Sequence, residues 1–178
     1  MTLDQLNRLD DSAASAWFEQ TCAASRWVSL MVAARPYHEP QALYKAARES
    51  WQTMNEDDAR EAFEAHPMIG DVNSLRARFA STKATASVEQ KGTAAASEAT
   101  LSQLHQLNHE YLAKHGFIFI ICATGLSAEA MLDELRQRLP NDTATELKNA
   151  AEQQIQITLL RLGKALNADA QSAGEPTS

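Results

Sequence analysis

The chain has 178 residues and carries 16 lysines and arginines against 23 aspartates and glutamates, which gives a formal net charge of −7 with neutral histidines. This length predicts one domain whose core is large enough to be stable without disulfide bonds or a structural metal. The acidic balance and the lack of a basic cluster argue against nucleic acid as a partner, because affinity for the phosphate backbone depends on many cationic contacts.

The cysteines and the apolar stretches indicate whether the protein is secreted or inserted in a membrane. Cys22 and Cys122 are the two cysteines, and they lie far apart in the sequence, which is not the pattern of a secreted disulfide framework. The most apolar stretch, residues 117–123, is much shorter than the ~20 residues that span a bilayer. We therefore expect a cytoplasmic protein that is not inserted in a membrane.

The composition indicates an all-α fold. The chain has 32 alanines and 19 leucines against 6 glycines and 5 prolines, which suits helices. Helix-start signals recur along the chain, and Thr143 with Glu146 forms a potential capping box. The other starts are Asp11-Ser12, Pro40 in a first helical turn, Asn55 before Glu56-Asp57-Asp58, Ser127 and Asp142.

Apolar residues recur at helical spacing in the second half of the chain, as in Leu101, Leu104 and Leu107 and again in Ile155, Leu159 and Leu162. These stripes predict long helices over about 87–114 and 143–166. We expect a single helical domain of about eight helices over 1–166. Residues 167–178 lose apolar content, which predicts a flexible C-terminal tail.

Two stretches depart from the helical pattern. His66-Pro67 disfavours helix, because the residue before a proline avoids the α region. Residues 116–125 read by propensity as a buried strand. A lone strand would leave backbone polar groups without partners in the interior, and a polar ligand could satisfy them.

Several polar residues allow both a structural and a chemical interpretation. His66 could cap a helix C-terminus or act as an acid or base near neutral pH. Ser87 and Gln90 could form a capping box, with Glu89 as an ordinary first-turn acid. Arg161 lies on a largely apolar helix, where it could extend to solvent or face an anion in a pocket.

Histidines and tryptophans supply the remaining candidates. His105 and His109 stand four residues apart, with His115 beyond, which is compatible with metal ligands on one helix face, but no acidic cluster lies near them. We therefore expect no metal site. Tryptophan side chains commonly anchor cores or interfaces, and this is the expected role of Trp17, Trp27 and Trp51.

The order of these elements resembles one family, the 2-oxo-4-hydroxy-4-carboxy-5-ureidoimidazoline (OHCU) decarboxylases of urate catabolism. The resemblance covers about Leu9 to Leu166. It is carried by Ala34-Arg35-Pro36-Tyr37, His66-Pro67 with Ile69-Gly70, Glu89-Gln90, Asn108-His109-Glu110-Tyr111, Gly116-Phe117-Ile118-Phe119 and Arg161-Leu162.

The resemblance implies a cofactor-free decarboxylase, a homodimer, that converts OHCU to (S)-allantoin as the last step from urate to allantoin. Such an enzyme must stabilise the electron pair left by carbon dioxide and deliver a proton to one face of the carbon.

The resemblance also implies the site residues. His66 matches the catalytic histidine and Glu89 its acidic partner. Gln90 matches a residue that holds a substrate amide, and Arg161 matches a catalytic residue that holds the oxygen-rich end of the substrate. The remaining substrate-contacting positions are Pro67, Ser87 and the main-chain groups of Phe119, Ile120, Ile121, Cys122 and Ala123.

The sequence departs from the family pattern at Met68 and Asp71, beside His66-Pro67, and again before Glu89. The family often has a serine three residues before the glutamate, whereas Ala86 stands there and the serine is Ser87. Two other functions stay open: a non-catalytic helical module that binds a partner through Trp17, Trp27 and residues 117–121, and a metal-dependent ureide hydrolase that uses His105, His109 and His115.

Overall fold

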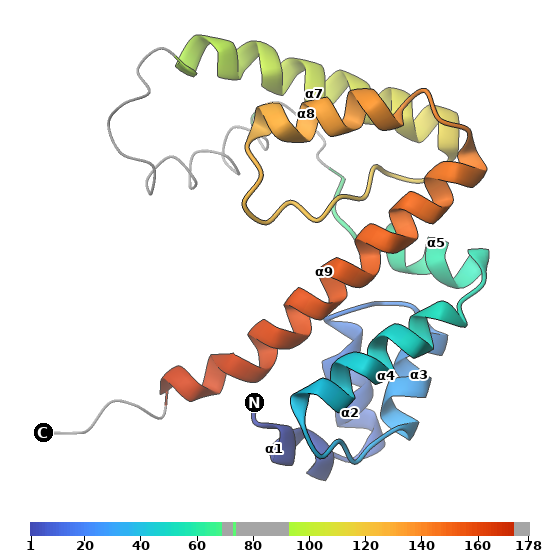
Figure 1. Ribbon diagram of the computed structural model, residues 1–178, viewed down its shortest axis with the longest axis vertical. Helices are drawn as coiled ribbons and strands as arrows, with labels where there is room; N and C mark the ends of the chain where they lie inside the picture. The colour runs from blue at the N-terminus through green and yellow to red at the C-terminus, as the bar shows by residue number, and fades with distance from the viewer. Residues whose placement is uncertain (69–72, 74–92, 173–178) are drawn as a thin grey trace, which may run out of the picture. The chain divides into compact units, whose positions relative to one another are not determined.

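The computed structural model describes residues 1–68, 73 and 93–172, and this part of the chain contains eight helices and no strand (Figure 1). The prediction of an all-α protein is confirmed. The helices are α1 (Leu3–Arg8), α2 (Asp11–Glu19), α3 (Ser25–Ala33), α4 (Pro40–Gln52), α5 (Glu56–Glu64), α7 (Thr93–His115), α8 (Ala128–Arg138) and α9 (Thr143–Ser172).

Several helices begin at the predicted start signals. The Asn55 carboxamide accepts a hydrogen bond from the amide of Asp58 at 2.9 Å, and the Asp58 carboxylate accepts one from the Asn55 amide, which completes a capping box. Ser127 caps α8 by accepting from the amide of Ala130 at 3.1 Å. Pro40 occupies the first turn of α4.

The start of α9 differs from the expectation. Asp142 is the cap, since its carboxylate accepts from the amide of Thr145 at 2.7 Å. Glu146 is fully buried and hydrogen bonded to other side chains, so the predicted Thr143–Glu146 capping box is wrong. At its other end α9 continues to Ser172, beyond residue 166, while the flexibility of residues 167–178 stays a prediction.

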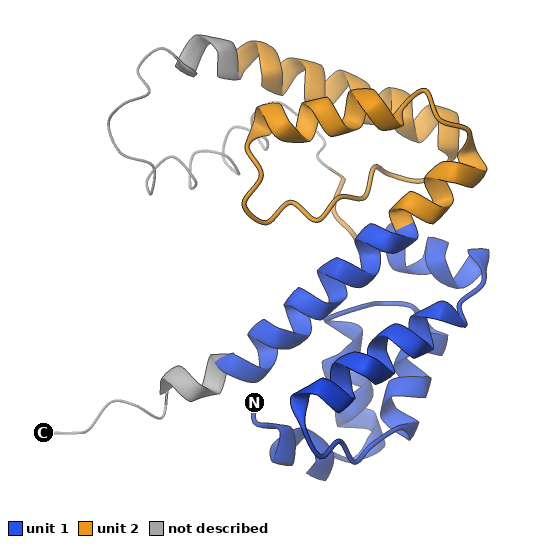
Figure 2. Cartoon of the chain, in the orientation of Figure 1, with its two compact units in different colours: residues 1–65, 151–178 blue, residues 66–150 orange. Residues whose placement is uncertain are grey.

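The chain groups into two compact units (Figure 2). Unit 1 consists of residues 1–65 and 151–178, and unit 2 of residues 66–150. Helix α9 belongs to both, because the boundary between Ala150 and Ala151 falls within it.

Unit 1 is built around the apolar face of α3. Trp27 of this helix is fully buried, stacks edge-on against Phe18 at a centroid distance of 5.9 Å and donates its indole N–H to the carbonyl of Ala47 at 3.1 Å. Arg35 binds the C-terminal end of α1, because its Nη1 donates hydrogen bonds to the carbonyls of Leu6 and Leu9. The Ala34-Arg35-Pro36-Tyr37 motif therefore has a structural role here.

Unit 2 contains α7 and α8, which pack side by side (Figure 1). Gly116 ends α7 with a positive φ of 75°, a conformation that glycine adopts readily. The residues between α7 and α8 form no helix, as expected for the segment near 117–123, and the strand that propensity suggests over 116–125 does not form in the described chain. The high β propensity of this stretch instead reflects burial, since Phe117, Phe119 and Ile120 lie in the core of the unit.

Candidate active site

His66 and Pro67 follow helix α5. The helix ends at Glu64, Ala65 is its C-cap, and the Ala65 amide donates to the carbonyl of Phe63. The side chain of His66 is half-buried and Pro67 is exposed. An imidazole in this position has access to solvent, which proton exchange requires.

Three of the predicted site residues, Ser87, Glu89 and Gln90, lie outside the described residues, as does Ala86. Their roles stay predictions.

The segment Phe119–Ala123 lies between α7 and α8 in unit 2. The side chains of Phe119 and Ile120 are buried, whereas Ile121, Cys122 and Ala123 are half-buried. The Phe119 ring packs edge-on against the buried Tyr111 ring with centroids 5.4 Å apart. Among the described residues, the main-chain amides of Phe119 and Ile121 have no hydrogen-bond acceptor. These donors are therefore suited to a ligand rich in carbonyl oxygens.

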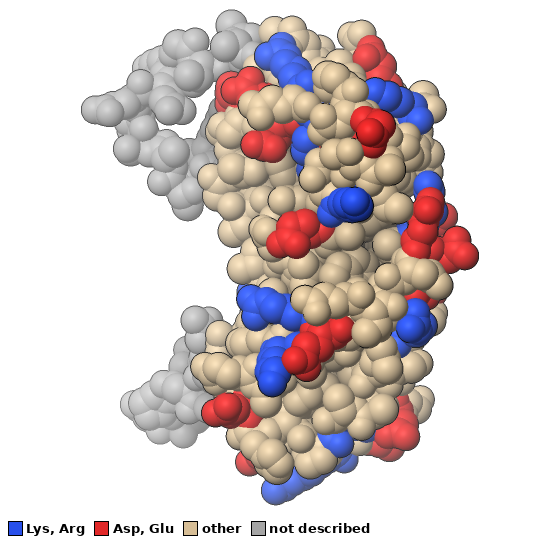
Figure 3. Space-filling view, turned by 45° about the vertical axis from the view of Figure 1, so that its right-hand side comes forward, with Lys and Arg blue, Asp and Glu red and all other residues tan. Residues whose placement is uncertain are grey.

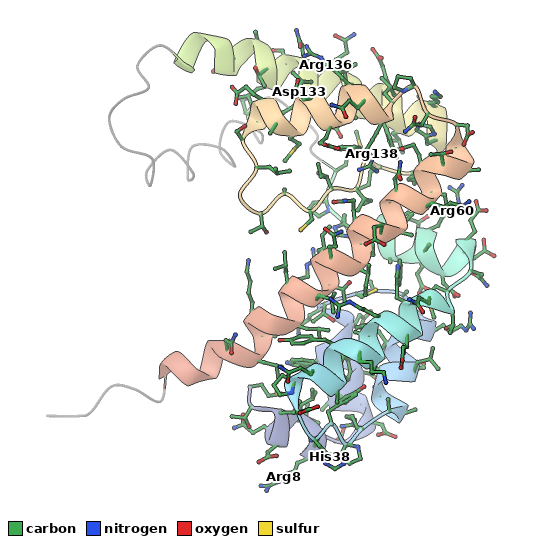
Figure 4. The ribbon with its side chains drawn as sticks, in the orientation of Figure 1. Arg8, His38, Arg60, Asp133, Arg136 and Arg138 are labelled. Atoms are coloured by element: carbon green, nitrogen blue, oxygen red, sulfur yellow. The ribbon has the colours of Figure 1, made fainter. Side chains whose placement is uncertain are left out.

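Arg138, at the C-terminal end of α8, contacts this segment directly (Figure 4). Its Nη1 donates to the carbonyl of Ile120 at 2.7 Å, and its guanidinium carbon lies 4.5 Å from the centroid of the Phe119 ring. The arginine Nε donates to the Glu146 carboxylate at 2.8 Å.

The Glu146 carboxylate is surrounded by donors. Besides Arg138, it accepts from Tyr111 Oη at 2.7 Å, Asn149 Nδ2 at 2.6 Å and Asn141 Nδ2 at 3.1 Å. Burial acts to raise the pKa of Glu146, but these four hydrogen bonds together hold its pKa below the ordinary value of 4.5. Glu146 is therefore a buried carboxylate that stays ionised at neutral pH.

Arg138 was not among the predicted site residues, and Glu146 was predicted to belong to a helix cap. One signal was available. Arg138 follows Met131 and Leu135 at helical spacing, which places an arginine on the buried face of α8. An arginine in such a position needs a buried partner, and Glu146 is that partner.

Arg161 lies on α9 within unit 1. Its side chain is exposed, and Nη1 is 3.5 Å from the carbonyl oxygen of Thr21, which is long for a hydrogen bond. The following residue, Leu162, is fully buried. The guanidinium is thus held at the margin of the core with donors available to a ligand, while the other described candidates belong to unit 2.

The geometry of the histidines does not favour the metal-dependent alternative. The rings of His105 and His109 are 4.7 Å apart, but His115 is buried, with its Nδ1 3.0 Å from the Thr143 hydroxyl. Over residues 1–68, 73 and 93–172, no group of three histidine, cysteine or acidic side chains is placed to hold a metal ion.

The partner-binding alternative meets a similar difficulty. Trp27 is fully buried and hydrogen bonded within unit 1, and Phe117, Phe119 and Ile120 are buried in unit 2. Side chains in these positions are core residues and offer little surface to another protein.

On the face in Figure 3, acidic and basic side chains are interspersed. In the described part of the chain, no helix combines the length and apolar character needed to cross a bilayer.

Comparison with known proteins places this architecture in one family. The family model for OHCU decarboxylase matches residues 7–163. The uric acid degradation bifunctional protein TTL of Arabidopsis thaliana is 35% identical over 158 residues, which are 88% of this chain and 48% of that protein. A 2-oxo-4-hydroxy-4-carboxy-5-ureidoimidazoline decarboxylase of Haloferax volcanii is 22% identical over 95% of this chain and 98% of its own length. The chain therefore spans about half of the Arabidopsis protein and nearly all of the Haloferax one.

Two solved structures share the fold. A crystal structure of OHCU decarboxylase in the presence of (S)-allantoin has a TM-score of 0.68 at 32% identity and covers 89% of this chain and 99% of that one. A crystal structure of (S)-allantoin synthase has a TM-score of 0.67 at 17% identity, covers 94% of this chain and 55% of that one, and shows likeness of fold alone. Because the family model extends over most of the sequence, this chain belongs to the OHCU decarboxylase family.

Proposed function

We propose that this protein catalyses the stereospecific decarboxylation of OHCU to (S)-allantoin, the last step from urate to allantoin. The observation that carries the proposal is the match of the family model to residues 7–163. It is supported by the likeness to the crystal structure of an OHCU decarboxylase in the presence of (S)-allantoin, which covers 89% of this chain and 99% of that one.

The reaction breaks the bond between the carboxylate carbon and the ring carbon. The electron pair of that bond stays on the ring carbon, carbon dioxide leaves, and the carbon then takes up one proton. Catalysis requires groups that interact more strongly with the transient carbanion than with the substrate, and a donor on one face only. All of this is acid–base and electrostatic chemistry, so we propose that it proceeds without a cofactor.

In this mechanism His66 delivers the proton or polarises the substrate hydroxyl, and Glu89 orients the imidazole. The half-buried position of His66 after α5 supports this role, because the ring can exchange its proton with solvent between turnovers.

Neutral and cationic donors hold the substrate. Gln90 pairs with the ureido or ring amide, and Arg161 holds a carboxylate or ring carbonyl with its forked donors. The main chain of Phe119–Ala123 supplies further hydrogen bonds, and Pro67 and Ser87 complete the proposed set of substrate-binding residues. The amides of Phe119 and Ile121 support this assignment, because no described residue accepts from them. We further propose that the enzyme acts as a homodimer in the cytoplasm.

The test is to generate OHCU enzymatically from urate, add the protein without metal or cofactor, and follow the circular dichroism of the allantoin formed. Rapid appearance of a signal of one sign is the expected result. A slow racemic background in the presence of folded protein would refute the proposal.

His66→Asn tests the assigned proton donor. We expect loss of the stereospecific signal with little change in thermal stability, because a half-buried turn residue contributes little core volume. His38→Asn is the matched control, since His38 is exposed and precedes α4 in unit 1 (Figure 4), and it should retain full activity. Wild-type turnover in His66→Asn would remove His66 from the mechanism.

A further inference from the structure

We propose that Arg138 is a positioning residue for this reaction: through the carbonyl of Ile120 it aims the neighbouring amide of Ile121 at the substrate. The inference rests on the proposed function, because it assumes that the main chain of Phe119–Ala123 binds OHCU.

Two arginines near the end of α8 differ in environment. The side chain of Arg136 is 50% exposed and lies 3.7 Å from the Asp133 carboxylate on the same helix, whereas the side chain of Arg138 is 9% exposed (Figure 4). A surface ion pair such as the first contributes little to folding. The buried guanidinium of Arg138 requires hydrogen-bond partners, and these partners indicate the role of the residue.

The contacts of Arg138 fix the guanidinium in orientation as well as in place. Nε is bound to the Glu146 carboxylate, Nη1 is bound to the Ile120 carbonyl, and the guanidinium lies over the Phe119 ring. Because the guanidinium is planar, two hydrogen bonds and a ring contact leave it no rotational freedom.

Glu146 in turn is anchored independently of Arg138. Tyr111 of α7 and Asn149 of α9 donate to it at 2.7 and 2.6 Å. The chain of contacts therefore runs from two helices through Glu146 and Arg138 to one carbonyl in the irregular segment.

The rigidity of the peptide group transmits this position to the next residue. The carbonyl of Ile120 and the amide of Ile121 belong to one planar peptide unit, in which C=O and N–H point in opposite directions when the bond is trans. The Ile120 carbonyl points toward Arg138, from which it accepts a hydrogen bond, so the Ile121 amide points away from Arg138. No described residue accepts a hydrogen bond from this amide. A donor held in this way needs no reorganisation when a substrate carbonyl arrives.

Stability alone does not explain an arginine here. A buried ion pair is often no more stabilising than apolar side chains of similar volume, and Nη2 of Arg138 has no partner among the described residues. An arginine is nevertheless the side chain that can join a carboxylate and a carbonyl with a fixed angle between them.

The test is Arg138→Lys, with Arg136→Lys as the matched control. A lysine can keep the ion pair with Glu146 but cannot hold Ile120 through the same planar group, so we expect KM for OHCU to rise at least about tenfold, with kcat falling less. Arg136→Lys should leave both constants unchanged. If Arg138→Lys folds less well, the double variant Arg138→Met/Glu146→Gln removes the charges together and should show the same rise in KM.

The outcomes separate the two proposals. An inactive wild-type protein would refute the proposed function and with it the substrate role of Arg138. An active wild type with unchanged KM in both Arg138 variants would overturn the positioning role alone. Hydrogen exchange provides a readout besides activity: saturating allantoin should slow exchange of the Ile121 amide in the wild type and in Arg136→Lys, and much less in Arg138→Lys. Equal protection in all three proteins would also overturn the positioning role.

Discussion

Replacing Glu146 by glutamine tests the energetic importance of the buried network in unit 2. In the wild type, Oε1 accepts from Tyr111 and Arg138, and Oε2 accepts from Asn141 and Asn149. Glutamine can keep an oxygen toward the first pair, but its NH2 group then faces two amide donors. The substitution also leaves the Arg138 charge buried without a counter-ion.

The expected loss in the free energy of unfolding is about 3–5 kcal/mol, the range for removing one partner of a buried ion pair. Tyr111→Phe is the matched control, because it removes one hydrogen bond to the same carboxylate and should cost about 1.5–3 kcal/mol. Urea unfolding followed by far-ultraviolet circular dichroism measures both. A loss below about 1 kcal/mol in Glu146→Gln would mean that the ion pair is already solvated, and would refute the reasoning.

The same carboxylate predicts a pH dependence. Because the folded-state pKa of Glu146 is held below the unfolded value of 4.5, its contribution to stability is complete above about pH 4.5. It is lost as the pH falls through the lowered folded-state pKa. The difference in stability between wild type and Glu146→Gln should therefore be largest at neutral pH and shrink in acid, and a difference that stays constant with pH would contradict the assignment.

Three further outcomes are expected. Arg161→Lys should raise KM for OHCU, because a point charge cannot reproduce the fork of a guanidinium, and unchanged steady-state kinetics would contradict the bidentate role. Phe119→Ala should lower the free energy of unfolding by about 3–5 kcal/mol, since the ring is buried against Tyr111 and Arg138, and a thermal melt as high as that of the wild type would exclude this packing. Burial raises the pKa of the Cys22 thiol to about 11, so thiol reagents at neutral pH should leave it unmodified in the native state and modify it after unfolding, as peptide mass spectrometry can show.

Local signals in the sequence predict the helices well. Asn55, Ser127 and Pro40 each begin a helix at or beside the expected position, because capping depends on residues within one turn of each other. The apolar stripe of α7 is likewise local, and Leu101 and Leu104 are buried as it predicts.

The errors involve residues whose partners are distant in sequence. Glu146 has the spacing of a capping residue relative to Thr143, but its carboxylate is bound by Tyr111 of α7 and Arg138 of α8. Residues 116–125 have the β-branched and aromatic content of a strand, yet no strand pairs with them in the described chain. In both cases packing between elements outweighs local propensity. A single sequence shows the local propensity but not the packing.

For the candidate site, the residue types alone point to His66 and to the unusual apolar stretch, while the roles of Glu89 and Gln90 depend on the family resemblance. Arg138 was missed because an arginine on a helix is ordinarily an exposed residue. The sequence spacing places Arg138 on the same helix face as Met131 and Leu135, but it does not show that Glu146 is the partner of Arg138.

The proposed recognition by main chain is consistent with the lack of charged side chains in Phe119–Ala123. If the amides of this segment bind the substrate, the chemistry depends on the path of the backbone and not on polar side chains. That path is set by burial of Phe119 and Ile120 and by the hydrogen bond from Arg138 to the Ile120 carbonyl. Substitutions of the half-buried side chains of Ile121 and Cys122 should then reduce activity less than substitutions of the residues that set the backbone path. Those residues are Phe119, Arg138 and Glu146. Arg138 and Glu146, which help to set this path, are the residues that a single sequence does not reveal, because their partners are distant along the chain.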